Sequence, residues 1–473
     1  MSMPIAAEPS PTEAGTALDQ AGLPRETIAS WIAAGGAVAG DYRRDADAFS
    51  RQWQIGAELL ARLSRKPARS EREAAAAAAI LDRDRAARER FLAVHADAVY
   101  RHLTKDYAEF ERVETLVRDA ALALPGLVPD AARLAQDSGI PQREKDGVEI
   151  DQGIFLAHIL AHPAAGMHLC HAMLLPRPEA LELRQQYFER GTLALDSAGI
   201  ERDGKASLIT MRNRRFLNAE DETTLDDLEI AVDLATLDPA TAIGILRGDT
   251  VEHPKFRGKR LFSAGINLTH LYHGRISYVW YIKRELGLVN KLFRGVARPD
   301  ISPDEIYGGT TEKPWVAAVE GFAIGGGCQL LLAMDYVLAA SDAYMTLPAR
   351  KEGIIPGASN MRLWRFTGDR IARQAILYGR RLDCDTPEGR LVCDEVVAPD
   401  TLDGALKAVV DGFTGSGVVS AAGNRRAIRV AQEPLDLFRR YMAVYAREQA
   451  YCHFSPALIA NLERNWGAQN RAP

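Results

Sequence analysis

The sequence predicts an α/β fold in which helices wrap a sheet, with an all-helical domain before it and a helical tail after it. Three observations support this prediction. Long stretches of helical periodicity fill residues 26–202, short apolar runs alternate with helical patterns over 203–410, and helical spacing returns over 411–473. Residues 1–25 are rich in Pro, Ala and Glu, a composition typical of a disordered N-terminus.

The first helices are expected over residues 43–65, 70–103 and 109–122, where apolar residues recur at helical spacing between clusters of turn-forming residues. In the second of them, Leu81 and Phe91 lie among arginine and aspartate residues, which indicates one buried face. These segments therefore predict a packed helical domain ahead of the sheet.

In the middle of the chain, apolar runs at 206–211 and 242–246 predict strands, and helical patterns at 224–235 and 270–293 alternate with them. The tail over 421–466 is helical and carries aromatic side chains that look exposed. A helix that covers the chain's own core is one explanation of this tail. These aromatic residues are Phe438, Tyr441, Tyr445, Tyr451, Phe454 and Trp466.

Composition excludes several classes of function. The 473 residues are 47% apolar, enough for ordinary buried cores, and a formal net charge of -5 predicts no binding to nucleic acid. No apolar run reaches the roughly 18 residues of a membrane span, and the first residues lack the pattern of a signal peptide. Five cysteines without a Cys-x-x-Cys pair indicate reduced thiols. We therefore expect a soluble, cytoplasmic protein.

The most informative motif is the glycine turn Gly325-Gly326-Gly327, which follows an apolar run and opens an expected helix. Backbone N–H groups in the first turn of a helix lack partners within the helix, so they point at any anion that lies there. Glycine clusters also serve tight turns and close packing, and this motif alone does not separate the two uses.

A second turn changes the balance between these readings. Ala264-Gly265-Ile266-Asn267-Leu268 also follows an apolar strand and also places glycine where the backbone must turn closely. Because N–H donors on two separate loops can converge on one carbonyl oxygen, the two turns together predict an oxyanion site.

Together these turns resemble the crotonase (enoyl-CoA hydratase/isomerase) family, in which an Ala-Gly-x-Asp-Leu loop precedes an Asn-Gly-x-x-x-Gly-Gly-Gly helix start. The matching donors are the amides of Ile266 and Gly326. Segments 214–220, 354–358 and 385–397 also resemble family motifs in the same order. The resemblance implies the crotonase fold, a ββα superhelix, and assembly into homotrimers or hexamers.

The departures from the family pattern concern its acids. Hydratases of this family carry one carboxylate just after the glycines and another before the Ile-Pro-Gly turn, where this chain has Gln329 and Ala349. Neither side chain can titrate, so the paired acid/base addition of water is unavailable at these positions. The remaining site can still acidify the Cα–H of a thioester and hold the enolate.

This combination, with the long helical extension, resembles the arylacetyl-CoA dioxygenases of the family. The resemblance implies that the enolate of 3,5-dihydroxyphenylacetyl-CoA reacts directly with O₂, without metal or flavin. It also implies release of CoA and 3,5-dihydroxyphenylglyoxylate, a precursor of aryl amino acids in peptide antibiotics. The alternatives are a crotonase thioesterase or decarboxylase, and a non-catalytic protein that binds acyl-CoA.

Arg284 and Glu220 are the polar candidates for contact with the substrate. Arg284 lies off the apolar stripe of the helix expected at 270–293, in a segment from which related crotonases send a side chain into the site; a solvated arginine is the alternative. Glu220 borders the acyl pocket in the family pattern, where it could accept a hydrogen bond from a ring hydroxyl. Gln329 is expected to form a neutral wall. The Cα base stays open between Glu220, Glu352, a substrate phenolate and water.

The remaining candidates surround these turns. Ile324 and Ile354, with Leu347 and Ile355, could form an aliphatic pocket that admits O₂ and keeps water from the enolate, although core packing explains them equally well. Cys328 is expected to fill a tight packing site, and a nucleophilic thiolate is the alternative.

A short basic run precedes the first turn and could bind the phosphates of CoA, or could simply be a solvated loop. It consists of Lys255, Arg257, Lys259 and Arg260.

A cluster of histidines near residues 158–171 suggests a metal site, but Pro163 breaks its helix and no acidic ligand lies close by in the sequence. We expect no metal there and favour a histidine-rich seam formed by His158, His162, His168, Cys170 and His171.

Overall fold

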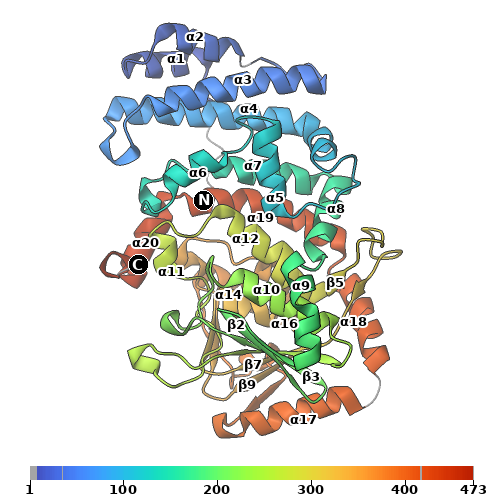
Figure 1. Ribbon diagram of the computed structural model, residues 1–473. Coiled ribbons are helices and arrows are strands. Elements are labelled where there is room, and N and C mark those ends of the chain that lie inside the picture. The colour runs from blue at the N-terminus through green and yellow to red at the C-terminus, as the bar shows by residue number, and fades with distance from the viewer. Residues whose placement is uncertain (1–7, 35, 416–417, 472–473) are drawn as a thin grey trace. The chain divides into compact units, whose positions relative to one another are not determined.

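The computed structural model describes residues 8–34, 36–415 and 418–471 and divides into two compact units (Figure 1). The first unit comprises Met1–Leu169, Tyr272–Val279 and Met442–Ile459. The second comprises Cys170–Leu271, Trp280–Tyr441 and Ala460–Pro473. The structure thus divides the chain differently from the predicted ranges 26–202, 203–410 and 411–473, because strands begin before residue 203 and part of the tail belongs to the first unit.

The first unit is helical. Within it α3 and α4 lie side by side, and α7 packs against α4 (Figure 1). Its main helices are α1 (Pro11–Gln20), α2 (Arg25–Ala34), α3 (Tyr42–Ala61), α4 (Glu71–Leu103), α5 (Val113–Ala123), α6 (Ala131–Asp137) and α7 (Ile150–Ala161).

Residues 1–25 were predicted to be disordered, and for residues 8–25, which the structure describes, this prediction was wrong. Helix α1 begins with a capping box, in which the Ser10 side chain accepts from the Glu13 amide and the Glu13 carboxylate accepts from the Ser10 amide. Leu18 on this helix is fully buried. The Ser-x-x-Glu signal was present in the sequence and outweighs the Pro- and Ala-rich composition; residues 1–7 lie outside the described part.

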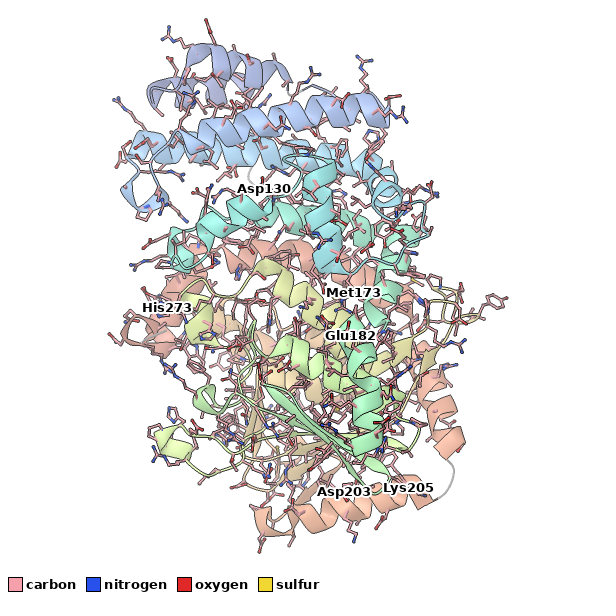
Figure 2. All side chains as sticks on the ribbon, viewed as in Figure 1. Asp130, Met173, Glu182, Asp203, Lys205 and His273 are labelled. Carbon is pink, nitrogen blue, oxygen red and sulfur yellow. The ribbon has the colours of Figure 1, made fainter. Side chains whose placement is uncertain are left out.

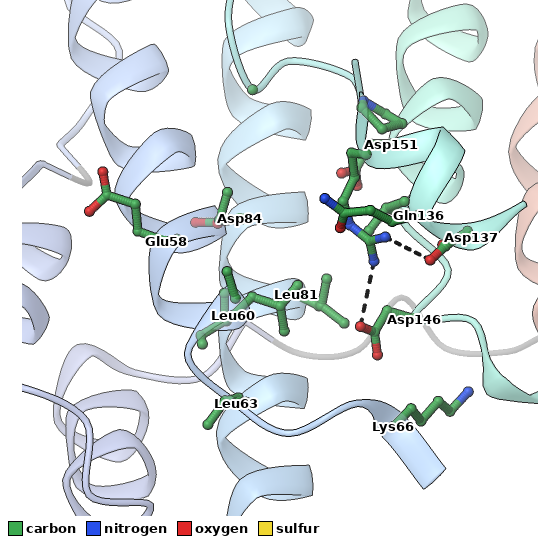
Figure 3. Close-up of a pocket in the computed structure, with 18 of the residues that line it drawn as sticks. Glu58, Leu60, Leu63, Lys66, Leu81, Asp84, Gln136, Asp137, Asp146 and Asp151 are labelled. Carbon is green, nitrogen blue, oxygen red and sulfur yellow. Dashed lines mark hydrogen bonds and ion pairs between the residues drawn. The ribbon is translucent and has the colours of Figure 1, made fainter. Parts of the chain in front are cut away.

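A pocket of about 1000 Å³ lies in the helical unit (Figure 3). Leu60, Leu63 and Leu81 line part of it. Arg133 on its wall pairs with Asp137 at 2.6 Å and lies 3.6 Å from Asp146, and Asp146 also pairs with Arg69 at 2.5 Å, so these charges are balanced within the unit.

The second unit is built on a seven-stranded sheet with the order β1-β2-β3-β4-β7-β9-β12. Strands β1 to β3 are antiparallel, and the neighbours from β3 to β12 are parallel. Figure 2 marks the β2–β3 hairpin by Asp203 and Lys205. The strands are β1 (Thr192–Ala194), β2 (Ala198–Asp203), β3 (Ala206–Met211), β4 (Ile243–Gly248), β7 (Trp315–Val319), β9 (Tyr336–Ala340) and β12 (Glu395–Val397).

Two smaller sheets accompany the large one. Strand β10 pairs in parallel with β8 and antiparallel with β11, and β5 pairs with β6. Central strands β4 and β7 are buried along their whole length, as expected of parallel strands covered on both faces. The smaller sheets contain β5 (Val296–Ala297), β6 (Thr310–Thr311), β8 (Phe322–Ile324), β10 (Tyr344–Thr346) and β11 (Leu382–Asp383).

Helices cover the large sheet: α10 packs on β2 and β3, and α17 packs against β4 and β9 (Figure 1). The helices of the later part of the chain are α8 (Pro163–Leu174), α9 (Pro178–Arg190), α10 (Leu225–Leu237), α11 (Leu268–Tyr272), α12 (Tyr278–Lys283), α13 (Asn290–Arg294), α14 (Gly326–Leu331), α15 (Ala349–Glu352), α16 (Ser359–Arg373), α17 (Leu402–Gly415), α18 (Val418–Gln432), α19 (Leu435–His453) and α20 (Pro456–Trp466).

Two expectations about helices need correction. The helix expected over 270–293 is broken, because Gly274 adopts a left-handed φ of 69° after α11 and a π-helical turn follows at Arg284–Val289. The aromatic residues of the tail are not exposed: Phe438 and Tyr445 are buried, and the other four are partly buried.

Among the described residues, no single helix has the length and hydropathy to cross a bilayer, and the bent pair Ile150–Ala161 and Pro163–Arg190 meets that test only jointly.

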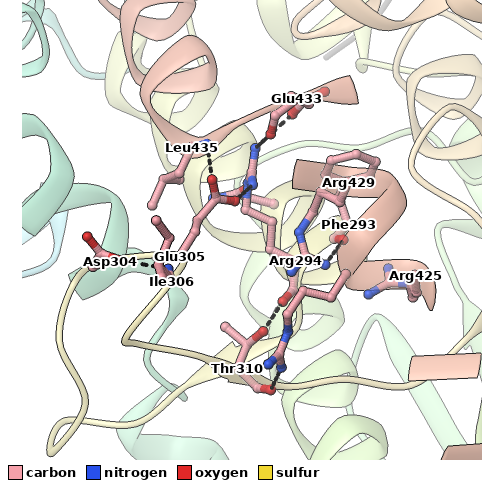
Figure 4. A network of polar contacts seen from close by, with 12 residues as sticks. Phe293, Arg294, Asp304, Glu305, Ile306, Thr310, Arg425, Arg429, Glu433 and Leu435 are labelled. Atoms are coloured by element: carbon pink, nitrogen blue, oxygen red, sulfur yellow. Dashed lines mark hydrogen bonds and ion pairs between the residues drawn. The ribbon is translucent and has the colours of Figure 1, made fainter. Parts of the chain in front are cut away.

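A network of buried ion pairs surrounds Glu433, just before α19, within the second unit (Figure 4). Glu433 is fully buried and accepts from Arg362 at 2.9 and 3.0 Å and from Arg365 at 2.8 Å. Arg294 contacts the same carboxylate and also pairs with Glu305 at 2.6 Å. Burial opposes ionisation, but Arg362, Arg294 and Arg365 lower the pKa of Glu433 to about 2.

Substitution Glu433→Gln should destabilise the protein by about 3–5 kcal/mol, because it leaves buried guanidinium groups without a counter-charge. Because the pKa of Glu433 is lower in the folded than in the unfolded protein, its contribution to the free energy of unfolding should be complete above the unfolded pKa. This contribution should disappear as the pH falls towards about 2. Denaturant unfolding at several pH values measures both effects. Asp369→Asn, which breaks the exposed Asp369–Arg373 pair, is the matched control and should leave the stability near the wild-type value.

Candidate active site

The glycine turn connects β8 to α14. Gly325 is the N-cap of α14 and has φ 50° and ψ −111°, a conformation that side-chain-bearing residues avoid. Its amide donates to the Thr346 carbonyl at 2.9 Å, which fixes the turn against β10. The next amide, on Gly326, opens the helix and has no intrahelical acceptor.

The second loop packs directly on this turn. The Ile324 amide donates to the Ser263 carbonyl at 3.0 Å, and Ser263 forms a parallel bridge with Ala323. Gly265 has φ 78°, and a Cβ on it would lie 2.5 Å from the Ile324 carbonyl oxygen and 2.9 Å from the Gly326 nitrogen. Only glycine fits at this point, because the two backbones approach without room for a side chain.

The amides of Ile266 and Gly326 are the donors that face this junction. The Glu220 amide donates to Gly265 at 2.7 Å and its carbonyl accepts from Asn267 at 2.8 Å, so Ile266 is held between two bonds to one residue. Within the described ranges, the Ile266 and Gly326 amides themselves donate no hydrogen bond. Two unused donors on loops in contact are suited to stabilise one oxyanion.

A buried ion-pair network lies beneath the turn and is centred on Arg284. Its Nε and Nη2 donate to both oxygens of Glu220, at 2.6 and 3.0 Å. Its Nη1 donates to Glu285 at 2.6 Å and to Gln329 at 2.7 Å, and Nη2 also donates to the Gly326 carbonyl at 3.0 Å. These bonds use all five donors of the guanidinium.

The network changes what Arg284 and Glu220 can do. Arg284 is buried rather than solvated, and its donors bind the protein, so it positions the Gly326 peptide. Contact of Arg284 or Glu220 with a substrate stays a prediction, and it would require one of these bonds to be shared or exchanged. Gln329 belongs to the same network and presents its oxygen to Arg284.

The Ile-Pro-Gly loop is held by the same group of residues. The second oxygen of Glu285 accepts from the Ala358 amide at 3.0 Å, and the Tyr441 hydroxyl donates to the Gly357 carbonyl. Sequence reasoning missed Glu285 and Tyr441. The adjacency of Glu285 to Arg284 was the available signal, because two consecutive charges in an apolar segment must find partners when buried.

A third group fixes the first loop from the other side. Asp221 accepts from the Asn267 side chain at 2.9 Å, and its carboxylate lies 3.0 Å from Nδ1 of His270. Burial opposes ionisation of Asp221, but hydrogen bonds from His270, Thr223 and Asn267 lower its pKa to about 2. Asn267 therefore supports the loop through its side chain.

Apolar residues lie around the two turns. Leu347 and Ile354 are buried, as is Ala349, while Ile324 is partly exposed. Cys328 is buried, and burial raises the pKa of its thiol to about 12, which favours the packing role. Leu268 begins α11, and Gly327 packs on Ser263, where a Cβ would lie 2.8 Å from the Ser263 Cβ.

Comparison with known proteins places the chain in a family. The enoyl-CoA hydratase/isomerase model matches residues 303–416. The chain is 47% identical over 407 residues to the (3,5-dihydroxyphenyl)acetyl-CoA 1,2-dioxygenase of Amycolatopsis orientalis, covering 86% of this chain and 92% of the relative. It belongs to the enoyl-CoA hydratase/isomerase, or crotonase, family.

More distant crotonases match about half of the chain. The short-chain-enoyl-CoA hydratase of Clostridium acetobutylicum is 26% identical over 238 residues, covering 50% of this chain and 82% of the relative. The crystal structure of an enoyl-CoA hydratase/isomerase from Xanthobacter autotrophicus Py2 aligns with a TM-score of 0.47 and 22% identity, over 58% of this chain and 96% of that one. Family membership confirms the predicted crotonase fold and the resemblance drawn from the motifs.

The basic run of this crotonase lies on its surface. Lys255, Arg257 and Lys259 are exposed, and Arg260 is partly exposed and donates to the Gly248 carbonyl. The loop leads directly into the first turn of the site. Binding of CoA phosphates by these residues stays a prediction.

The histidines predicted to form a seam each have a separate partner. His158 lies 2.6 Å from Glu89, His162 3.5 Å from Asp97, His168 2.9 Å from the Tyr100 hydroxyl, and His171 3.0 Å from the Arg298 carbonyl. In the part of the chain that the structure describes, no three His, Cys, Asp or Glu side chains are arranged to hold a metal ion, and the five cysteines are free.

Substitution Gly326→Ala should cost about 3 kcal/mol in kcat/KM, the usual scale for loss of one oxyanion donor. The new Cβ would lie 2.5 Å from the Glu220 oxygen that Arg284 holds, so the amide must move. Steady-state kinetics measures the loss. Gly404→Ala, in a helix where a Cβ meets no atom within 4 Å, is the control and should keep full activity; equal kinetics for both variants would refute the assignment of Gly326.

Proposed function

We propose that this crotonase is a dioxygenase that converts (3,5-dihydroxyphenyl)acetyl-CoA and O₂ into 3,5-dihydroxyphenylglyoxylate and CoA. The observation that carries the proposal is the pair of unused amides on Ile266 and Gly326, beside Gln329 and Ala349 where hydratases have acids. The 47% identity to the Amycolatopsis orientalis dioxygenase supports the choice of substrate. The product would serve as a precursor of aryl amino acids in peptide antibiotics.

The first chemical step is enolate formation. The Cα–H of an arylacetyl thioester is unusually acidic, because the enolate is conjugated with both the ring and the thioester. Two preorganised amides that bind the developing oxyanion lower the barrier further, by about 3 kcal/mol for each donor. Because residue 329 is a glutamine, no acid at that position can return a proton to the enolate carbon.

The second stage uses O₂ as the electron acceptor. The enolate carbon adds O₂ to give a Cα peroxide, and the terminal peroxide oxygen attacks the thioester carbonyl carbon and expels the CoA thiolate. Cleavage of the O–O bond with loss of the remaining Cα proton gives the α-keto acid. One oxygen atom enters the keto group and the other the carboxylate, so the atoms balance without another oxidant.

The proposal includes a reaction without metal or flavin and a homotrimeric or hexameric assembly in the cytoplasm. The apolar side chains near the two turns, Ile324, Leu347 and Ile354, support an environment that excludes water from the enolate. Exposed Trp364, Leu377 and Tyr378 in the second unit are consistent with contact between subunits.

Purified protein with (3,5-dihydroxyphenyl)acetyl-CoA in air should release one CoA for each O₂ consumed, and CoA release should stop when O₂ is removed. A free-thiol assay and an oxygen electrode measure the two quantities. Incubation under ¹⁸O₂ should place label in both the keto and the carboxylate groups.

The same experiment tests the alternatives. Equal CoA release without O₂ would identify a thioesterase, and binding without any turnover would identify an acyl-CoA-binding protein. Either result would overturn the dioxygenase.

Treatment with EDTA followed by desalting should leave the turnover unchanged, because no step of the proposed reaction uses a metal. Elemental analysis of the active protein should show far less than one iron or copper per chain. Loss of turnover that either metal restores would contradict this part of the proposal.

A further inference from the structure

We propose that Glu352 is the base that removes the Cα proton of the thioester. The inference rests on the proposed function, since it assigns a proton-transfer step within that reaction. It concerns a residue outside the two positions where crotonase hydratases carry their acids.

Glu352 lies at the end of the short helix α15, and its carboxylate faces the glycine turn. Its two carboxylate oxygens lie 3.8 and 3.9 Å from the position that a Cβ on Gly325 would occupy. The Cα of Gly265 lies 4.0 Å from the same point. The carboxylate therefore borders the junction of the two loops that carry the Ile266 and Gly326 donors.

Glu352 lies on the same short helix as Ala349, the position where hydratases of the family carry an acid. Ala349, at the start of the helix, occupies the place of a hydratase acid, and Glu352 follows three residues later. Residues three apart on a helix share a face, so Glu352 presents a carboxylate on the same side, one turn further along. The acid of the family pattern is thus displaced along α15 rather than lost from it.

Glu352 is the carboxylate near these turns that remains available. Glu220 and Glu285 are bound to Arg284, and Asp221 is bound to Asn267 and His270. Within the described ranges, the Glu352 carboxylate has no hydrogen bond or ion pair, although the residue is only 4% exposed. A buried carboxylate without a partner is costly for stability, which favours a role in the chemistry.

The surroundings of Glu352 suit a base at neutral pH. Burial alone raises its pKa to about 7. Arg350 and Lys351 on its own helix are exposed, and the glycine turn and the packed segment Gln374–Tyr378 contain no ionised side chain. A base with this pKa is partly ionised at pH 7 and stronger than an ordinary glutamate, which is the balance that general-base catalysis requires.

The proton transfers balance over the whole reaction. Glu352 takes one Cα proton, the C–H electron pair forms the enolate double bond, and the carbonyl pair moves to the oxygen held by Ile266 and Gly326. After the peroxide expels CoA, the thiolate receives this proton from Glu352. The regenerated carboxylate takes the second Cα proton as the O–O bond breaks; that C–H pair forms the keto group, and the O–O pair goes to the carboxylate oxygen of the product. Glu352 then releases this proton to water.

Exchange of the Cα protons without O₂ isolates this step. Protein and (3,5-dihydroxyphenyl)acetyl-CoA are incubated anaerobically in D₂O, and deuterium at Cα is followed by mass spectrometry. Glu352→Gln should slow enzyme-catalysed exchange by about 10²-fold or more while the Kd for the thioester stays near the wild-type value and the Tm does not fall. Glu182→Gln, the same change at an exposed position, is the matched control and should exchange at the wild-type rate.

A second variant tests the chemistry directly. In Glu352→Ala, added formate should restore exchange in proportion to its concentration, because a small carboxylate can enter the space left by the side chain. Wild-type exchange in Glu352→Gln would overturn the assignment. Exchange that depends on Glu352 in a protein that consumes no O₂ would instead support the base and overturn the proposed dioxygenase, so the two failures are distinguishable.

Discussion

The guanidinium of Arg284 connects the segments from which the site is made. It binds the side chain of Glu220, whose backbone hydrogen bonds on either side of Ile266 hold the first donor. It also binds the Gly326 carbonyl and so holds the peptide next to the second donor. Through Glu285 it reaches the Ala358 amide in the Ile-Pro-Gly loop. Because these partners come from distant parts of the chain, the geometry of the two donors depends on one buried cation with all its hydrogen bonds satisfied.

The carboxylates near the two turns fall into two kinds: those that form ion pairs within the protein, and Glu352, which we propose takes part in the reaction. Carboxylates that form ion pairs with Arg284 or His270 are committed to holding loops in place. Glu352 has burial without such partners, which changes its proton affinity in the opposite direction from that of Asp221. Similar side chains a short distance apart therefore serve different purposes because their surroundings differ.

Much of the fold follows from local sequence. The apolar run 206–211 is strand β3 without a shift of boundaries, and the glycine turn opens a helix as expected, because both depend on neighbouring residues. The role of Arg284 was not predictable in this way, since its partners lie up to 64 residues away. The π-helical turn that carries it was also missed, because apolar spacing over 270–293 is compatible with a continuous helix.

That π-helical turn at Arg284–Val289 has a consequence for the placement of Arg284. A π turn absorbs one residue more than a regular α turn, so α12 and α13 continue on either side of it while its first residue, Arg284, reaches Glu220 and the Gly326 carbonyl. The cation that anchors the glycine turn therefore stands on a local departure from regular helix that the flanking helices do not share.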